Sequence, residues 1–347
     1  MADFVPGLTL AARFYRDVVA PSVPVRHAAA LLGAGSEVLG LDTVRSTDHD
    51  WGPRCQVFVA PDDVVPVRAS VHAALPAAYA GWPVAVGSDT RTPRARVEVD
   101  TWPRWVVEVL GAEPVDAFDW LVLPQQRLLS VTAGVVLADP DGELGALRER
   151  LRWYPDDVWW WLLACQWQRL AQEEPWVQRA AEVGDHLGSR LVAARQVRDV
   201  VRLALLVGRT YAPYGKWLGS VFTRLPDPDG LGDALAAALD ADTVTGREAA
   251  LGAAYQRVAA RFNALAPDLD VDVSLRSFHD RPATVLGAER FAAAALARVA
   301  DPVLGGLPLV GAVDQLLDAT DALAHPARLV GLRAYYAGLS AAARTDE

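Results

Sequence analysis

Two aspartates with one residue between them, Asp48 and Asp50, have the residue type and spacing for metal-dependent chemistry in this chain of 347 residues. On a strand, residues i and i+2 point to the same face, so the two carboxylates would converge on one point. Converging carboxylates repel each other unless a cation lies between them. Such a pair suits Mg²⁺, which takes oxygen ligands and also binds phosphate oxygens. We predict that both aspartates are metal ligands; the competing interpretation is a solvated turn in which each bonds to its own backbone.

A glycine-containing turn precedes the aspartates. The apolar run from Ala28 to Leu32 is typical of a buried strand, and it ends in Gly33-Ala34-Gly35-Ser36. Glycine lets the backbone approach a phosphate closely, with N–H groups pointing at it. We therefore predict that Gly35 and Ser36 contact a phosphate. The alternative for Ser36 is that it caps a short helix.

A third acidic position comes from the segment 94–100, which alternates with the period of a strand. Glu98 and Asp100 lie on one face of this strand, and Val97 and Val99 lie on the other. We predict that both acids contribute to the metal site, with Glu98 as the third catalytic carboxylate because it is deeper in the strand. Asp100 remains the alternative, and one of the two acids could instead pair with an arginine of the same strand.

The order of these features resembles the nucleotidyltransferase superfamily related to DNA polymerase β and kanamycin nucleotidyltransferase. In that superfamily a Gly-Ser turn is followed by Asp-x-Asp and then by an acidic residue on a later strand. Longer runs are similar to the uncharacterised bacterial family DUF4037. These runs are residues 35–42 and 46–53, Trp167-Gln168-Arg169, Gly188-Ser189-Arg190-Leu191 and Phe278-His279-Asp280-Arg281-Pro282.

The resemblance implies an Mg²⁺-dependent nucleotidyltransferase that moves AMP from ATP to a hydroxyl or similar group of a small molecule. Asp48, Asp50 and Glu98 would then hold one or two Mg²⁺ ions against the phosphates. Two other classes stay open. One is a nucleotide-binding protein without catalysis, and the other is a modifier of protein or RNA of the toxin–antitoxin type.

The elements that must position these residues fall into two parts. Across residues 1–142, segments with the period of a helix alternate with strand-like segments, which predicts a small α/β domain. The resemblance implies that this domain is nucleotidyltransferase-like, with a mixed sheet. Beyond Gly142 the strand-like alternation disappears and long helical patterns follow, so residues 143–347 are predicted to form an all-α helical bundle. The predicted fold class is therefore α+β, with two domains.

Lysine occurs once, as Lys216, against 32 arginines. If arginine serves wherever a generic cation is needed, Lys216 marks a place that requires a compact ammonium. It follows an arginine-rich helix and lies in the segment 211–217, between aromatic residues. We predict that it binds the triphosphate from the helical domain, and the alternative is an exposed lysine whose stem lies on Trp217.

Composition narrows the classes of partner. The net charge of −10 argues against broad nucleic-acid binding. No apolar run reaches the ~18 residues of a membrane span, and the N-terminus lacks the features of a signal peptide. Cys55 and Cys165 are far apart and form no metal-binding motif, so we expect buried thiols in a reducing cytoplasm. We expect a cytoplasmic protein that binds a nucleoside triphosphate and a small acceptor.

Overall fold

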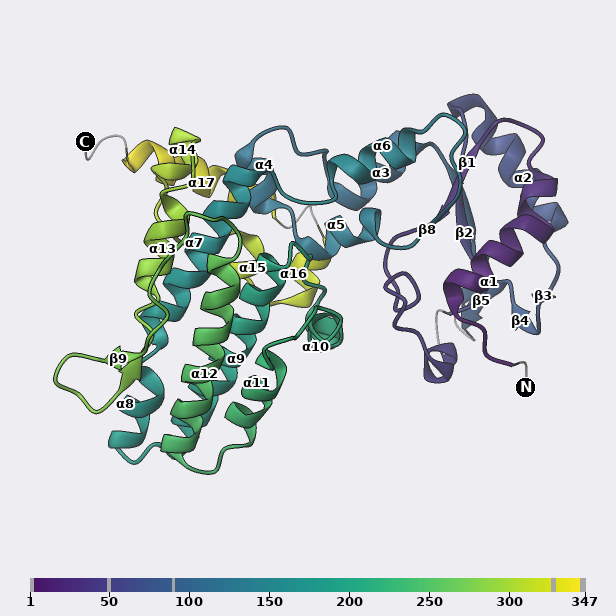
Figure 1. Ribbon diagram of the computed structural model, residues 1–347. Helices are drawn as coiled ribbons and strands as arrows, with labels where there is room; N and C mark the ends of the chain where they lie inside the picture. The colour runs from purple at the N-terminus through teal and green to yellow at the C-terminus, as the bar shows by residue number, and fades with distance from the viewer. Residues whose placement is uncertain (1–2, 49–50, 89–90, 326–328, 344–347) are drawn as a thin grey trace. The chain divides into compact units, whose positions relative to one another are not determined.

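The computed structural model describes residues 3–48, 51–88, 91–325 and 329–343. The chain forms two compact units that alternate along the sequence (Figure 1). Unit 1 comprises residues 1–113 and 127–152, and unit 2 comprises residues 114–126 and 153–347. The chain therefore passes between the units three times. The single division predicted after residue 142 falls inside unit 1, and as a statement about domains it stays a prediction.

Unit 1 is built on a four-stranded mixed sheet with the order β7-β2-β1-β8. β1 pairs antiparallel with both β2 and β8, and β2 pairs parallel with β7, so β7 is an edge strand of this sheet. The strands are β1 (Ala28–Leu31), β2 (Cys55–Phe58), β7 (Val97–Asp100) and β8 (Val135–Ala138). Together with the helices of unit 2, this sheet confirms the predicted α+β class.

Alternation along β2 and β7 gives the sheet two different faces. One face carries Cys55, Val57, Val97 and Val99, which are buried in a core with Phe14, Val67 and Val71 from α1 (Gly7–Phe14) and α2 (Val64–Ala74). Burial raises the pKa of the Cys55 thiol to about 12, so this thiol is protonated and takes part in packing. Both cysteines of the chain are buried and free, as predicted. The other face carries the polar side chains described below.

Two features of unit 1 differ from what the sequence indicates. The segment from Gly87 to Pro93 reads as a polar loop, but β5 (Ala85–Ser88) and β6 (Arg91–Ala95) pair there as an antiparallel hairpin. The single strand expected over 94–100 is divided at Arg96, whose N–H donates to the carbonyl of Val84 at 3.1 Å. Residues 97–100 then continue as β7, which keeps the expected alternation of Glu98 and Asp100.

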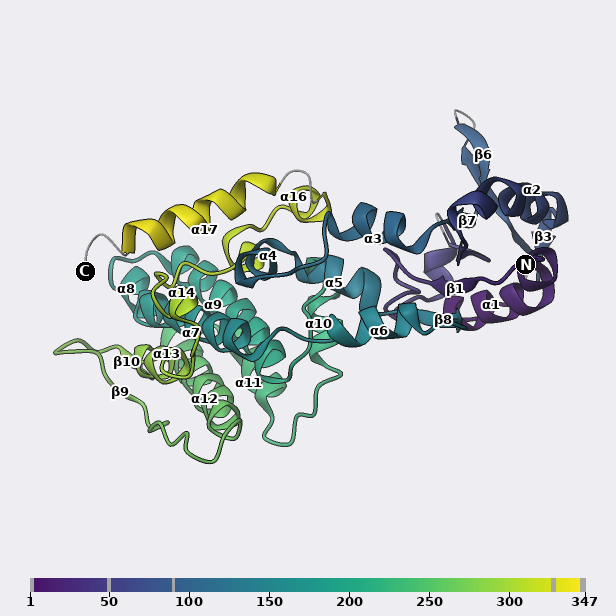
Figure 2. The same cartoon turned by 90° about the horizontal axis from the view of Figure 1, so that it is seen from above.

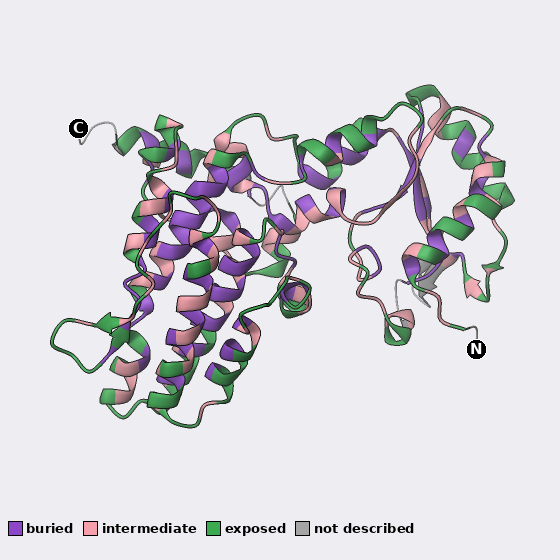
Figure 3. Ribbon diagram, viewed as in Figure 1, coloured by how far each residue is buried: buried purple, intermediate pink, exposed green. Residues whose placement is uncertain are grey.

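Unit 2 is helical, as the pattern beyond Gly142 predicts (Figures 1 and 3). Buried residues gather on the facing sides of its long helices, and exposed residues cover their outer sides. Helices that pack together in this unit are α7 (Asp156–Glu173), α9 (His186–Val207), α11 (Leu231–Asp240), α12 (Val244–Asn263) and the shorter α13 (Glu289–Leu296). In the part of the chain that the structure describes, no helix is long and apolar enough to cross a membrane.

Tryptophans fill much of this core. Trp161 and Trp167 of α7 are fully buried, and Trp167 stacks on Phe291 of α13. Near the C-terminus, α17 (Val330–Ala343) lies beside α4 (Ala117–Val122), where Arg333 pairs with Asp116 and Asp119 (Figure 2). The hydrogen bonds from Arg333 hold the pKa of Asp116 at about 2. The segment 114–126 is thus fixed in unit 2 by both packing and charge.

A buried carboxylate anchors the start of α13. Glu174 accepts hydrogen bonds from the backbone N–H groups of Leu286, Gly287 and Ala288, the last at 2.7 Å. Burial raises the pKa of Glu174 to about 7, although the three donors act in the opposite direction. Between pH 4.5 and about 7, the folded protein therefore holds a proton here that the unfolded chain has released.

Stability should accordingly fall as the pH rises through this range, because the folded state binds more protons than the unfolded state. We expect Glu174→Gln to melt at a lower temperature than wild type, since its amide N–H₂ faces backbone donors. Its melting temperature should also fall less steeply between pH 5 and pH 7.5. Calorimetric melts across this range test the slope, with the exposed Glu182→Gln as control. An unchanged slope in Glu174→Gln would contradict the assignment.

Candidate functional site

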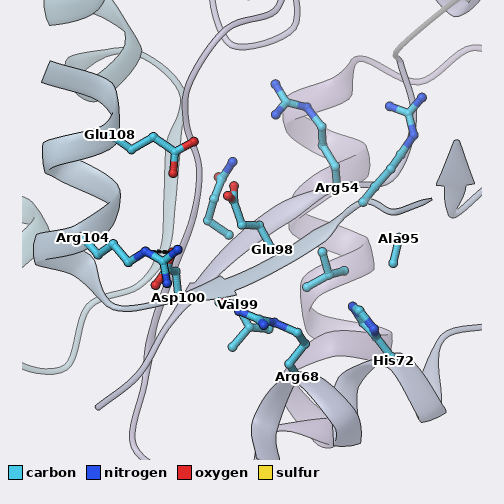
Figure 4. Close-up of a pocket in the computed structure, with 12 residues that line it drawn as sticks. Arg54, Arg68, His72, Ala95, Glu98, Val99, Asp100, Arg104 and Glu108 are labelled. Carbon is cyan, nitrogen blue, oxygen red and sulfur yellow. Dashed lines mark hydrogen bonds and ion pairs between the residues drawn. The ribbon is translucent and has the colours of Figure 1, made fainter. Parts of the chain in front are cut away.

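A pocket of about 720 Å³ lies along strand β7 in unit 1 (Figure 4). Residues of β2, β7, α2 and α3 (Trp102–Leu110) contribute to it, and we call it the β7 pocket. Its charged and ionisable lining consists of Glu98, Asp100, Glu108, Arg54, Arg68, Arg96, Arg104 and His72. A volume of this size suits a small ligand, and a lining with both charge signs suits one that carries phosphate and hydroxyl groups.

Glu98 and Asp100 lie on the same face of β7, as the alternation predicts. In the register of the sheet, Glu98 is opposite Gln56 of β2. Gln56 is buried, and its side-chain oxygen accepts the N–H of Leu32 at 3.0 Å, which fixes the neighbouring end of β1. The structure therefore places Glu98 in the pocket. Its neighbour Gln56 is hydrogen-bonded to the end of β1, the strand that leads into the glycine turn.

Asp100 is held by contacts to its own neighbourhood in the chain. One carboxylate oxygen of Asp100 accepts the N–H of Thr101 at 2.8 Å, and the other lies 3.5 Å from Nε of Arg104. These contacts hold the start of α3, where Thr101 is the N-cap. Only 7% of Asp100 is exposed. A metal ion at Asp100 would have to compete with Arg104. The choice of Glu98 as the third carboxylate stays a prediction.

The turn after β1 has the conformation that glycine permits. Gly33 and Gly35 have φ values of +90° and +139°. Among the described residues, no hydrogen bond uses the N–H of Gly35 or of Ser36, so both donors are available for an anion. Residues 36–40 form a turn and not a helix, so Ser36 is not a helix cap; its hydroxyl lies 3.4 Å from that of Ser46.

An ion pair beneath the turn holds its shape. Nε of Arg54 donates to Glu37 at 2.8 Å, and Nη2 of Arg54 donates to the carbonyl of Ala34 at 2.6 Å. Glu37 is buried, and a carboxylate in such a place is costly without a paired cation. Arg54 thus connects the glycine turn to the β7 pocket, which it also lines.

Gly35→Ala tests the turn, because a Cβ there would lie 2.5 Å from the Glu37 carboxylate. We expect the variant to displace the Glu37–Arg54 pair and to weaken Mg·ATP binding by about tenfold, the loss of one charge-assisted contact. Gly40→Ala is the matched control: its φ is also positive, at +61°, but no atom lies within 4 Å of the added Cβ. Calorimetric titration of both variants gives the comparison, and equal affinities would exclude this turn as a phosphate site.

The aspartate pair is only partly described. Asp48 is the last residue of a 3₁₀ turn (Val44–Asp48), and Asp50 lies outside the described residues, as does His49. The strand β2 begins only at Cys55, after Pro53, and pairs on both sides. The argument that strand alternation aims Asp48 and Asp50 at one point is therefore wrong for Asp48. Metal binding by the two side chains stays a prediction.

Among the side chains that the structure describes, no three of His, Cys, Asp or Glu are grouped closely enough to hold a metal ion. The described donors do fit a partial site, because Glu98 supplies carboxylate oxygen, the ligand type that Mg²⁺ prefers, in a pocket that also holds arginines.

Sequence reasoning missed Arg54, and it also missed two pairs of pocket residues on helices: Arg68 and His72 on α2, and Arg104 and Glu108 on α3. Each helical pair has i, i+4 spacing, which puts its members on one helix face. This spacing could have indicated that the residues line a pocket, but charged residues at helical spacing are equally typical of a helix face exposed to solvent. The predicted phosphate ligand Lys216 belongs to unit 2, where it is exposed and its Nζ lies 4.8 Å from the ring centroid of Trp217. Its role stays a prediction.

Residues 120–218 match the family model DUF4037, described as a domain of unknown function. This match confirms the resemblance over that segment, which contains Trp167-Gln168-Arg169 and Gly188-Ser189-Arg190. In the structure these residues tie helices together: Arg169 pairs with Asp199 at 2.9 Å, and the Ser189 hydroxyl accepts a hydrogen bond from Arg247. The matched segment does not include the glycine turn or the aspartate pair.

A search of curated proteins finds no match. Among solved structures, the chain is similar to a nucleotidyltransferase-like protein from Exiguobacterium sibiricum 255-15, with 13% identity and a TM-score of 0.32. The alignment covers 79% of this chain and 83% of that one.

Proposed function

We propose that this protein is an Mg²⁺-dependent nucleotidyltransferase that transfers AMP from ATP to a hydroxyl of a small molecule. The observation that carries the proposal is the β7 pocket, in which the Glu98 carboxylate faces a cavity lined by four arginines. The glycine turn, with two available N–H donors, is joined to this pocket by Arg54. Phosphate-binding donors and a carboxylate in one cavity are what nucleotidyl transfer needs.

In the proposed reaction, the acceptor hydroxyl oxygen bonds to the α-phosphorus of ATP. The bond from that phosphorus to the β-phosphate bridging oxygen breaks, and pyrophosphate leaves. Glu98 accepts the hydroxyl proton. The N–H groups of Gly35 and Ser36 and the guanidinium of Arg54 hold the phosphates while negative charge builds up on the leaving group.

Mg²⁺, held by Glu98 together with the predicted ligands Asp48 and Asp50, would neutralise phosphate charge. Asp100 is the less suitable ligand because its oxygens already contact Thr101 and Arg104. AMP as the transferred group and ATP as its donor are part of the proposal, and so is a small acceptor. The acidic net charge supports a small acceptor over RNA.

The direct test is incubation of the protein with isotopically labelled nucleoside triphosphates, Mg²⁺ and a metabolite extract. Pyrophosphate release together with an adduct heavier by one AMP supports the proposal. Binding of Mg·ATP without either product would favour a nucleotide-binding protein without catalysis. A label that appears on protein or RNA would favour a macromolecular acceptor.

A further inference from the structure

The arginines of the β7 pocket differ in whether their charge is compensated. Arg54 pairs with Glu37 at 2.8 Å, and Arg104 lies 3.5 Å from the Asp100 carboxylate. Arg68 differs, because among the described residues none of the ion pairs includes Arg68 or His72. Arg68 therefore adds a positive charge to the pocket that no described carboxylate neutralises.

The Arg68 side chain is nevertheless held in place. Its Nη2 donates to the carbonyl of Val99 at 2.7 Å, on strand β7. That bond uses one N–H of five and leaves the charge intact, so the rest of the planar fork can bind a carboxylate or phosphate. An ordered guanidinium also loses less conformational entropy on binding than a mobile one.

His72 lies one helical turn after Arg68 on α2 and also lines the pocket. The preceding residue of each, Val67 and Val71, is buried in the core against the apolar face of β7. This packing fixes α2 against β7, and it places Arg68 and His72 at the edge of that strand. Figure 4 shows the two side chains on the opposite side of β7 from the carboxylates of Glu98 and Glu108.

We propose that Arg68 and His72 form a binding site for an anionic group, phosphate or carboxylate, carried by the acceptor molecule. This inference rests on the proposed function and narrows its substrate class to hydroxyl compounds that bear a negative charge. The acceptor would cross the edge of β7, with its hydroxyl at Glu98 and its anion at Arg68. The nucleotide phosphates would lie instead at the glycine turn, which Arg54 contacts through the carbonyl of Ala34.

Calorimetric titration of the whole protein with inorganic phosphate tests the site. Wild type should bind phosphate, and Arg68→Gln should bind it about tenfold or more weakly, because a charge-assisted contact is lost. Arg68→Lys keeps the positive charge but lacks the planar guanidinium, so its phosphate affinity should lie between those of wild type and Arg68→Gln. His72→Gln should weaken phosphate binding by a smaller factor than Arg68→Gln does. Arg152→Gln is the control, since Arg152 is an exposed arginine of unit 1 that pairs with Glu149.

A second titration identifies the source of the anion. α,β-Methylene-ATP with Mg²⁺ should bind wild type and Arg68→Gln equally, and saturating phosphate should not displace it. If phosphate displaces the analogue, and Arg68→Gln weakens the binding of both phosphate and the analogue, then Arg68 binds the nucleotide and the proposal is wrong. Phosphate affinity unchanged in Arg68→Gln also overturns it. If wild type binds phosphate but not the analogue, the proposed function fails, and the assignment to an acceptor fails with it.

Discussion

Glu98→Gln should lower the rate of nucleotidyl transfer by about 100-fold or more, the usual cost of removing a general base. The glutamine has nearly the same shape, so the pairing of β7 with β2 should be kept. Asp100→Asn should cost less activity and more stability, because Asp100 holds Thr101 and Arg104 at the start of α3. Initial rates and melting temperatures of the two variants, measured side by side, check this ranking.

Glu108→Gln is the matched control for this experiment, since Glu108 lines the same pocket from α3 but is not on the strand. It should change the rate only slightly. The reverse ranking, with Asp100→Asn the less active variant, would move the catalytic role two residues along β7. In that case the contact between Asp100 and Arg104 would have to open when substrates bind.

The Asp48→Asn, Asp50→Asn double variant should lose Mg²⁺-dependent ATP binding by a factor on the order of 100, because the predicted ion would lose two charged ligands. Its fold should survive, since Asp48 lies in a turn outside the sheet. Calorimetry with ATP in the presence and absence of Mg²⁺ measures the effect. Asp62→Asn with Asp63→Asn is the control, another acidic pair of unit 1, at the start of α2. Wild-type affinity for Mg·ATP in the Asp48/Asp50 variant would show that these aspartates do not bind the metal.

The strands and strand faces that depend on residues close together in the sequence were predicted from local patterns. The apolar run ending at Gly33 predicts β1 because that strand is buried on both faces. The Glu98–Asp100 face was predicted as well, since alternation along a strand is fixed by backbone geometry.

Features that depend on pairing between distant segments were not predictable in the same way. The sequence of the β5–β6 hairpin indicates a loop because it is mostly polar and contains Gly87 and Pro93, whereas the stability of the hairpin comes from cross-strand contacts. Arg68 was not recognised as a pocket residue because its role depends on the position of α2 beside β7, through the carbonyl of Val99. Asp48 was assigned to a strand because the acidic pair precedes a β-rich run, but β2 begins seven residues later, at Cys55.

The threefold passage of the chain between the units bears on how the protein is made. Unit 1 needs β8, an edge strand of its sheet, and β8 emerges from the ribosome only after the segment 114–126. That segment exposes Trp120, Leu121 and Leu123 until the helices of unit 2 that bury them have been synthesised. A nascent chain paused after residue 152 would thus carry a finished sheet with an apolar loop in water. We expect such chains to be bound by a chaperone that recognises short apolar segments, and to be released once α7 and α17 are complete.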